Sequence, residues 1–408
     1  MTSAMGKYKC YVWKGANKWG QKATGVIVAE TESLAENEAR KLGLSISYLQ
    51  ERSLWMLPGN AHKKTKIVDI VFVMRQLSTL LSAGVPLVQA LEIMSFGAEK
   101  VKLRAMLFAI RDDIANGLTF SEALTNHPDF FNQLICGLIN AGEQSGTLDR
   151  MVGEVANYLE YQEYLKSRIK RAMYYPLTVL FITITVSVGM LLFLVPRFEK
   201  IYASFNAKLP AFTLLIISLS HHIRENWWII LIGLFLIFYG IRVLNQKSNR
   251  FQRIRDRFFI GVILFGPLIR KSIVSRICAT LSITLIAGIP LIDALSRVAR
   301  VANNQFFSDA LLQIREQVVQ GESIAFSMRG TLMFPIIVSQ MVEIGEKSGS
   351  LDQMLGRVGA YYRDQVNTSV EGLTTLIEPL LIAIIGVLVG IFVFAMYLPI
   401  FNLGLIVK

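Results

Sequence analysis

Three stretches of the chain are apolar enough to be membrane spans. Residues 176–196 carry no charged side chain, and as a helix these 21 positions would cross a hydrocarbon core of about 30 Å. Residues 379–407 are also free of charge, and their dense apolar part ends at Pro399. The third stretch, residues 227–241, is short, but it becomes long enough if Arg242 snorkels and the two following residues join it. The pattern therefore predicts three transmembrane helices.

Before the first of these stretches, apolar residues recur at helical spacing. The pattern runs from residue 67 to residue 96 and is interrupted at Gly84 and Pro86, because proline lacks a backbone donor and clashes with the preceding turn. A second helix should begin there, with Pro86 in its first turn. The sequence predicts a compact bundle of about six helices. The remaining helices are expected at 101–116, 119–125, 131–142 and 148–171.

The first fifty residues have a different pattern. Residues 8–15 and 25–30 alternate between apolar and polar positions, as strands do, and residues 45–50 form a third candidate strand. Residues 33–43 are expected to form a helix that begins with a capping box, in which Ser33 is the N-cap. We therefore expect a small β-β-α-β unit that a linker joins to the helical region.

The chain also repeats itself. AGVPLVQAL at residues 83–91 returns as AGIPLIDAL at residues 287–295, with six identities in nine positions. AGEQSGTLDRM at residues 141–151 returns as IGEKSGSLDQM at residues 344–354, with seven identities in eleven. The offset is 204 in the first pair and 203 in the second, and the second offset continues into the apolar stretches. Each copy is thus predicted to be a helical bundle followed by its own transmembrane helix.

Charge and duplication predict the same topology. The formal net charge is +12, and residues 163–171 and 242–257 together hold eight of these charges. The positive-inside rule places both segments in the cytoplasm. If both copies face the cytoplasm, one extra crossing must return the chain, and residues 227–244 have no partner in the repeat. The predicted parts are an N-terminal α+β unit with its linker (1–60), helical bundles (61–171 and 245–377), transmembrane helices (172–197, 226–244 and 378–400), a periplasmic loop (198–225) and a periplasmic tail (401–408).

The duplicated motifs contain the candidate functional residues. Gly146 suits the turn between two helices, and Asp149 falls in the first turn of the next helix, where the helix dipole favours negative charge. Glu143 has no such explanation. It could bind an arginine of a partner protein or, together with Asp149, a cation. With their counterparts in the second copy, the candidate partner-contact or structural residues are Arg75, Gly84, Pro86, Glu143, Gly146, Asp149, Gly288, Pro290, Glu346, Gly349 and Asp352.

Several classes of function are disfavoured. The chain has no phosphate-binding loop, no zinc-protease motif and no hydrolase nucleophile elbow, so neither an enzyme nor a cofactor is expected. The adjacent His221 and His222 make a poor chelating pair, because neighbours on a helix point in different directions. Apart from Arg242, which snorkels near the end of the third span, no charged residue lies inside the three apolar stretches, and this argues against a transporter. The basic segments flank spans, where they fix topology and contact anionic lipid, so no nucleic-acid partner is expected.

Taken together, these features resemble a known family. They are the duplicated A-G-[VI]-P-L-x-x-A-L and G-E-x-S-G-x-L-D motifs, the segment Met74–Ser78 ahead of the first motif, the three spans and the short N-terminal unit. This combination resembles the inner-membrane platform proteins of type IV pilus assembly, PilC, and their type II secretion counterparts of the GspF family. The second copy departs from the pattern, because Ala279 stands at the position of Arg75. A role of Arg75 is therefore not expected twice.

The resemblance implies a role without catalysis in the bacterial cytoplasmic membrane. Such a platform couples a cytoplasmic hexameric assembly ATPase to pilin extraction and pilus polymerisation. Its implied partners are that ATPase, pilin subunits, other inner-membrane pilus assembly proteins, the phospholipid bilayer and further copies of itself. A type II secretion platform shares this architecture and is the alternative. A non-catalytic signal relay is more distant, because residues 197–226 offer only about 30 residues for an outer domain.

Overall fold

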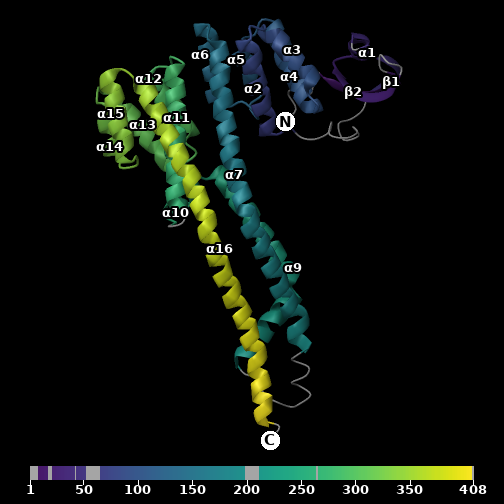
Figure 1. The fold of residues 1–408 in the computed structure, drawn as a ribbon, viewed down its shortest axis with the longest axis vertical. Coiled ribbons are helices and arrows are strands. Elements are labelled where there is room, and N and C mark those ends of the chain that lie inside the picture. The colour runs from purple at the N-terminus through teal and green to yellow at the C-terminus, as the bar shows by residue number, and fades with distance from the viewer. Residues whose placement is uncertain are drawn as a thin grey trace. The chain divides into compact units, whose positions relative to one another are not determined.

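The computed structural model describes residues 8–16, 21–41, 43–51, 65–197, 211–262 and 265–406 (Figure 1). The chain divides into two compact units. The first unit contains the N-terminal sheet and most of the short helices of both copies. The second unit contains the apolar parts of the long helices and the segment that connects the copies.

The N-terminal unit has the expected β-β-α-β order. Strands β1 (Lys9–Ala16), β2 (Lys22–Ala29) and β3 (Ser45–Glu51) form an antiparallel sheet with β1 in the centre, and α1 (Glu32–Lys41) lies between β2 and β3 in the chain. One set of sheet residues packs against α1, and the alternate set packs against α4 (Val101–Ala115) of the first copy. The prediction of Ser33 as the cap is wrong, because α1 already begins at Glu32 and the hydroxyl of Thr31 accepts the backbone N–H of Leu34 at 3.4 Å.

The two copies have the same helices in the same order. In the first copy they are α2 (Ile67–Ser82), α3 (Leu87–Gly97), α4 (Val101–Ala115), α5 (Phe120–Thr125), α6 (Gln133–Ser145) and α7 (Leu148–Gly189). In the second copy they are α11 (Gly266–Ile286), α12 (Leu291–Val301), α13 (Gln305–Val319), α14 (Ile324–Gly330), α15 (Ile336–Ser348) and α16 (Leu351–Ile406). Helices α2 to α7 surround one apolar core, in which Met74, Leu107, Phe120 and Leu138 are fully buried.

The last helix of each copy is longer than the sequence suggested. The sequence separates a short helix from the membrane span near residues 171 and 377, whereas α7 and α16 run through both regions without a break. Pro176 and Pro379 lie near these two boundaries, and a proline inside a membrane helix is tolerated. Beyond Gly189, the first copy continues as the π-helix η2 (Met190–Leu194), and it is helical up to Arg197, the last described residue of this part of the chain.

Two helices of the described residues are long and apolar enough to cross a membrane. They are the helices spanning Leu148–Arg197 and Leu351–Ala395, whose most apolar windows are only 11% buried. Their exposed side chains include Phe181 and Phe193, as expected of surfaces that face lipid. Hydroxyl groups in the first span donate to the carbonyl oxygens four residues earlier, for example Thr183 to Val179 at 2.9 Å. These bonds satisfy the polar atoms within the apolar stretch.

The connection between the copies contains α9 (Ala211–Lys247), which is bent at Asn226. The sequence predicts a periplasmic loop over residues 198–225. Residues 198–210 lie outside the described residues, and the rest of this segment is helical from Ala211. The expected span at residues 226–244 lies in the second half of α9, which includes the short apolar helix Phe235–Asn245. Helices α10 (Asn249–Gly261) and α11 are a second candidate for the third span. Together they are long and apolar enough to cross a membrane, but they are bent by 113° where they meet.

Apolar residues of three helices meet at η2 in the second unit. Leu191 and Val195 at the end of the first span form a buried cluster with Ile217 of α9 and Phe392 and Ala395 of α16. The buried hydroxyl of Ser220 donates to the carbonyl oxygen of Leu191 at 2.5 Å. This bond links α9 directly to the backbone of the π-helix.

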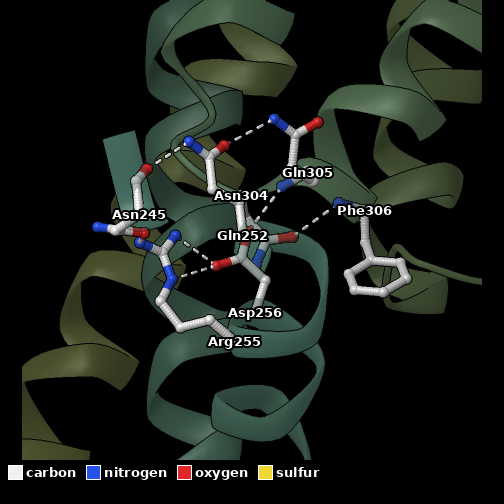
Figure 2. Close-up of polar contacts among 7 residues, drawn as sticks. All are labelled: Asn245, Gln252, Arg255, Asp256, Asn304, Gln305 and Phe306. Carbon is white, nitrogen blue, oxygen red and sulfur yellow. Dashed lines mark hydrogen bonds and ion pairs between the residues drawn. The ribbon is translucent and has the colours of Figure 1, made fainter. Parts of the chain in front are cut away.

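Helix α10 is attached to the second copy by a polar network (Figure 2). The carboxylate of Asp256 is buried and accepts the backbone N–H of Gln305, the first residue of α13, at 3.0 Å. The guanidinium of Arg255 donates to the same carboxylate at 2.5 and 2.9 Å, and the side chain of Gln305 donates to Gln252 at 3.2 Å. Part of the basic segment 242–257 is therefore held by hydrogen bonds within the protein (Figure 2).

The candidate site is a duplicated helix-capping arrangement

The motif with Gly84 and Pro86 forms the turn between the first two helices of each copy. Gly84 has a φ of +81°, a left-handed conformation that favours glycine. The N–H of Val85 bonds to the carbonyl of Leu80 at 3.0 Å, as in a Schellman C-cap. Pro86 is the N-cap residue of α3, one position before the first turn in which the sequence placed it. Gly288, with a φ of +75°, and Pro290 repeat the arrangement between α11 and α12.

Gly146 and Gly349 form the second duplicated turn. Both are left-handed, with φ values of +70° and +68°, and they end α6 and α15. The N–H of Thr147 bonds to the carbonyl of Gly142 at 2.9 Å, and the equivalent bond in the second copy is 3.0 Å. The next long helix begins one residue after Thr147, so the turn reverses the chain within three residues.

Gly142 and Gly345 allow the helix that follows the turn to lie close. A β-carbon at Gly142 would lie 2.7 Å from Cγ of Met151, and one at Gly345 would lie 2.8 Å from Cα of Leu351. Both distances are shorter than real β-carbon contacts. The absence of a side chain at both glycines therefore permits this close approach.

The carboxylates of Glu143 and Glu346 cap the short helix of their own copy. Glu143 accepts the backbone N–H groups of Phe120 and Ser121, at the start of α5, at 2.6 and 3.0 Å. Glu346 accepts those of Ile324 and Ala325, at the start of α14, at 3.0 and 3.4 Å. The first N–H groups of a helix have no partner within the helix, and negative charge is favourable there. The sequence left this role open.

Asp149 and Asp352 lie in the first turns of α7 and α16, as expected. Asp149 is exposed, and Asp352 is half-buried with its backbone carbonyl bonded to the hydroxyl of Ser282 at 2.7 Å. Among the described residues, no group of three or more His, Cys, Asp or Glu side chains could hold a metal ion. The hypothesis that Glu143 and Asp149 bind a cation therefore gains no support from these residues.

Arg75 joins α2 to α7 in the first copy. Its guanidinium donates to both carboxylate oxygens of Glu160 at 2.6 Å and to the side chain of Asn157 at 2.7 Å. These hydrogen bonds lower the pKa of Glu160, which lies before the apolar part of α7. In the second copy, Ala279 stands at the position of Arg75, and a β-carbon on the facing Gly359 would lie 3.0 Å from its backbone nitrogen. Close helix packing thus replaces the ion pair.

The ion pair of Arg75 should contribute little to stability. Both side chains are about two-fifths exposed, so water screens the attraction, and we expect a coupling free energy of no more than about 1 kcal/mol. A double-mutant cycle with Arg75→Ala and Glu160→Ala, measured by chemical denaturation in detergent, gives this value. The coupling should disappear as the pH falls through the lowered pKa of Glu160, because the protonated carboxyl carries no charge. A coupling of several kcal/mol at neutral pH would contradict this description.

The duplicated helices agree with known protein families. The family model for type II secretion system protein F matches residues 73–196 and again residues 277–399, which are the two copies. The chain belongs to the type II secretion system protein F family. Within this family, it is 40% identical over 400 residues to the type IV pilus assembly protein TapC of Aeromonas hydrophila, which covers 98% of this chain and 96% of TapC.

Two further members of the protein F family are informative. The type IV pilus assembly protein PilC of Pseudomonas aeruginosa is 39% identical over 374 residues, covering 92% of this chain and all of that protein. The type II secretion system protein F of Vibrio cholerae is 30% identical over 338 residues, covering 82% of each chain. The family match includes both duplicated turns and both long helices, whereas the N-terminal sheet precedes it.

Proposed function

We propose that this member of the protein F family is a type IV pilus assembly protein that acts as an inner-membrane platform. The observation that carries the proposal is the extent of similarity. Two relatives named for type IV pilus assembly, TapC and the PilC of Pseudomonas aeruginosa, match at 39–40% identity over at least 92% of this chain, whereas the type II secretion protein matches at 30% over 82%. The two apolar helices fit a membrane position.

The role we propose is mechanical, without catalysis. The polar residues of the duplicated motifs bond to the backbone of their own copy, as the carboxylates of Glu143 and Glu346 do. Each copy is linked to its apolar segment by a continuous helix, α7 or α16, so a force on the helical region could reach the membrane directly. We infer that an assembly ATPase acts on the helical copies and that pilin subunits and other inner-membrane assembly proteins contact the membrane part.

We further propose three spans, with both copies and the N-terminal unit in the cytoplasm and the C-terminus in the periplasm. The second half of α9 supports the third span, because its apolar side chains from Ile232 to Tyr239 include several that are 51–66% exposed. Helix α11 suits a protein core better, because it contains buried Ser275, Thr280 and Thr284. The basic segments 163–171 and 242–257 would then both lie on the cytoplasmic side.

Deletion of the gene distinguishes the pilus from the secretion function. We expect cells without the protein to lose surface filaments while pilin remains in the membrane and type II secretion continues at its normal level. Restoring the gene on a plasmid should restore the filaments. Normal filaments together with a loss of secreted proteins would favour the type II secretion alternative, and unchanged filaments and secretion would refute both.

A further inference from the structure

The two copies contact each other through different faces within the first unit. Helix α6 of the first copy contacts α12 of the second. At this contact Gly137 makes room for Arg297, since a β-carbon at Gly137 would lie 2.2 Å from Nη1 of Arg297. On α7, the buried Tyr158 lies near Thr280 and Arg276 of α11, and Ile283 of α11 packs against the apolar core to which Tyr158 belongs. We call the surface of Gly137 and Tyr158 the rear face, and that of Arg276, Thr280 and Arg297 the front face.

The front face of the first copy is not covered by the second copy. The repeat offset of 204 maps Arg276, Thr280 and Arg297 onto Phe72, Gln76 and Ile93. Phe72 is 60% exposed and Ile93 is 50% exposed, and Gln76 is exposed as well. Two arginines at the buried contact are therefore replaced by two large apolar residues on an open surface.

The rear face of the second copy is also open. The offset of 203 maps Gly137 and Tyr158 onto Gln340 and Tyr361, which are both exposed, with Tyr361 at 48%. Ile344, one helical turn beyond Gln340 on the same side of α15, is 50% exposed, whereas its counterpart is the smaller Ala141. Exposed apolar patches on a folded surface mark interaction sites.

The contact between the two copies leaves one front face and one rear face of the chain uncovered. If the copies met through the same face, the contact would be closed and no complementary surface would remain. A head-to-tail contact instead buries the rear face of the first copy and the front face of the second. The front face of the first copy and the rear face of the second then remain available to each other, but on different molecules.

We propose that a second copy of this chain binds there, with the rear face around Gln340 and Ile344 of one molecule against the front face around Phe72 and Ile93 of the next. The occupant follows from the internal contact, in which the equivalent faces already bind each other. Both open faces carry exposed apolar residues, which would be buried against each other in such a contact. At the internal contact the complementary residues are instead Gly137 and Arg297. Head-to-tail contacts of this kind produce rings or open arrays. The inference does not depend on which filament the protein assembles.

Cysteine cross-linking between differently tagged full-length chains tests this arrangement in membranes. One chain carries Ile93→Cys and the other carries Ile344→Cys, and a short bismaleimide joins cysteines that lie close together. We expect at least about tenfold more cross-linked dimer from this mixed pair than from either same-site pair. A single chain with both substitutions should give products larger than a dimer, because each molecule then has two reactive faces.

Three controls make the outcome decisive. Chains with only Cys10, Cys136 and Cys278 set the background. Val319→Cys on α13, which replaces another exposed apolar residue, should not cross-link to Ile344→Cys. The amount of each variant in the membrane shows that it is folded and inserted. Equal cross-linking by the same-site pairs would indicate a symmetric dimer and overturn the proposal, and so would equal cross-linking by the Val319 pair or background levels for every pair.

Discussion

Replacing both Glu143 and Glu346 with alanine is expected to lower the free energy of opening of the α5 and α14 regions by about 2 kcal/mol each, the usual contribution of hydrogen bonds to a charged group. Each carboxylate accepts two backbone N–H groups at a helix start. Alanine leaves these donors partly buried without their acceptor. The two sites lie in different copies, so the effects should be additive.

Hydrogen–deuterium exchange of the purified full-length protein in detergent measures this effect. A loss of about 2 kcal/mol corresponds to roughly thirtyfold faster exchange in the peptides that contain α5 and α14. The matched control is Glu316→Ala, which removes an exposed glutamate from α13 and should leave exchange unchanged. If the double variant exchanges like the unchanged protein, the carboxylates do not cap these helices and their role must be sought in a partner.

The second large effect is expected at Gly345. Its replacement by alanine places a β-carbon 2.8 Å from Cα of Leu351, and a backbone atom at the start of α16 cannot move aside as a side chain can. We expect a loss of about 1–3 kcal/mol in unfolding free energy, the range for overpacked sites. Gly142→Ala should have a similar cost, because the new β-carbon would lie 2.8 Å from Cβ of Met151, an atom that is fixed to the backbone of α7.

Chemical denaturation of the detergent-solubilised chain compares these variants. Gly330→Ala is the matched control, since a β-carbon at Gly330 on α14 meets no atom within 4 Å. That variant should be neutral or slightly more stable, because alanine favours the helix over glycine. Equal stability of the Gly345→Ala and Gly330→Ala proteins would show that the close approach of α16 is not required.

Local signals in the sequence predicted most of the helical region. Gly84 and Gly146 are turn residues for a local reason, since a left-handed φ is accessible to glycine at little cost. The helices between these turns follow from apolar spacing over short windows. The duplication adds an independent check, because a feature such as the Gly146 turn recurs at Gly349 with nearly the same φ.

Features that depend on distant contacts could not be predicted in this way. Glu143 lies 22 and 23 residues from the N–H groups that it caps, and no local pattern connects them. The continuous α7 and α16 were divided in the prediction because composition changes at the membrane boundary, although the backbone does not. The helix before Asn226 was assigned to a loop because its apolar run is too short to span a membrane, and length alone does not exclude a helix.

Reporter fusions test most directly the central claim that both copies face the cytoplasm, where one motor could act on both. Fusions of a cytoplasmic and a periplasmic reporter after residues 60, 170, 260 and 370, and near residue 208, sample every segment between the proposed spans. We predict a cytoplasmic signal at the first four positions and a periplasmic signal at the fifth. The fusion after residue 260 is decisive, because it follows the span without a partner in the repeat. A periplasmic signal there would contradict the account, since the two copies would then lie on opposite sides of the membrane.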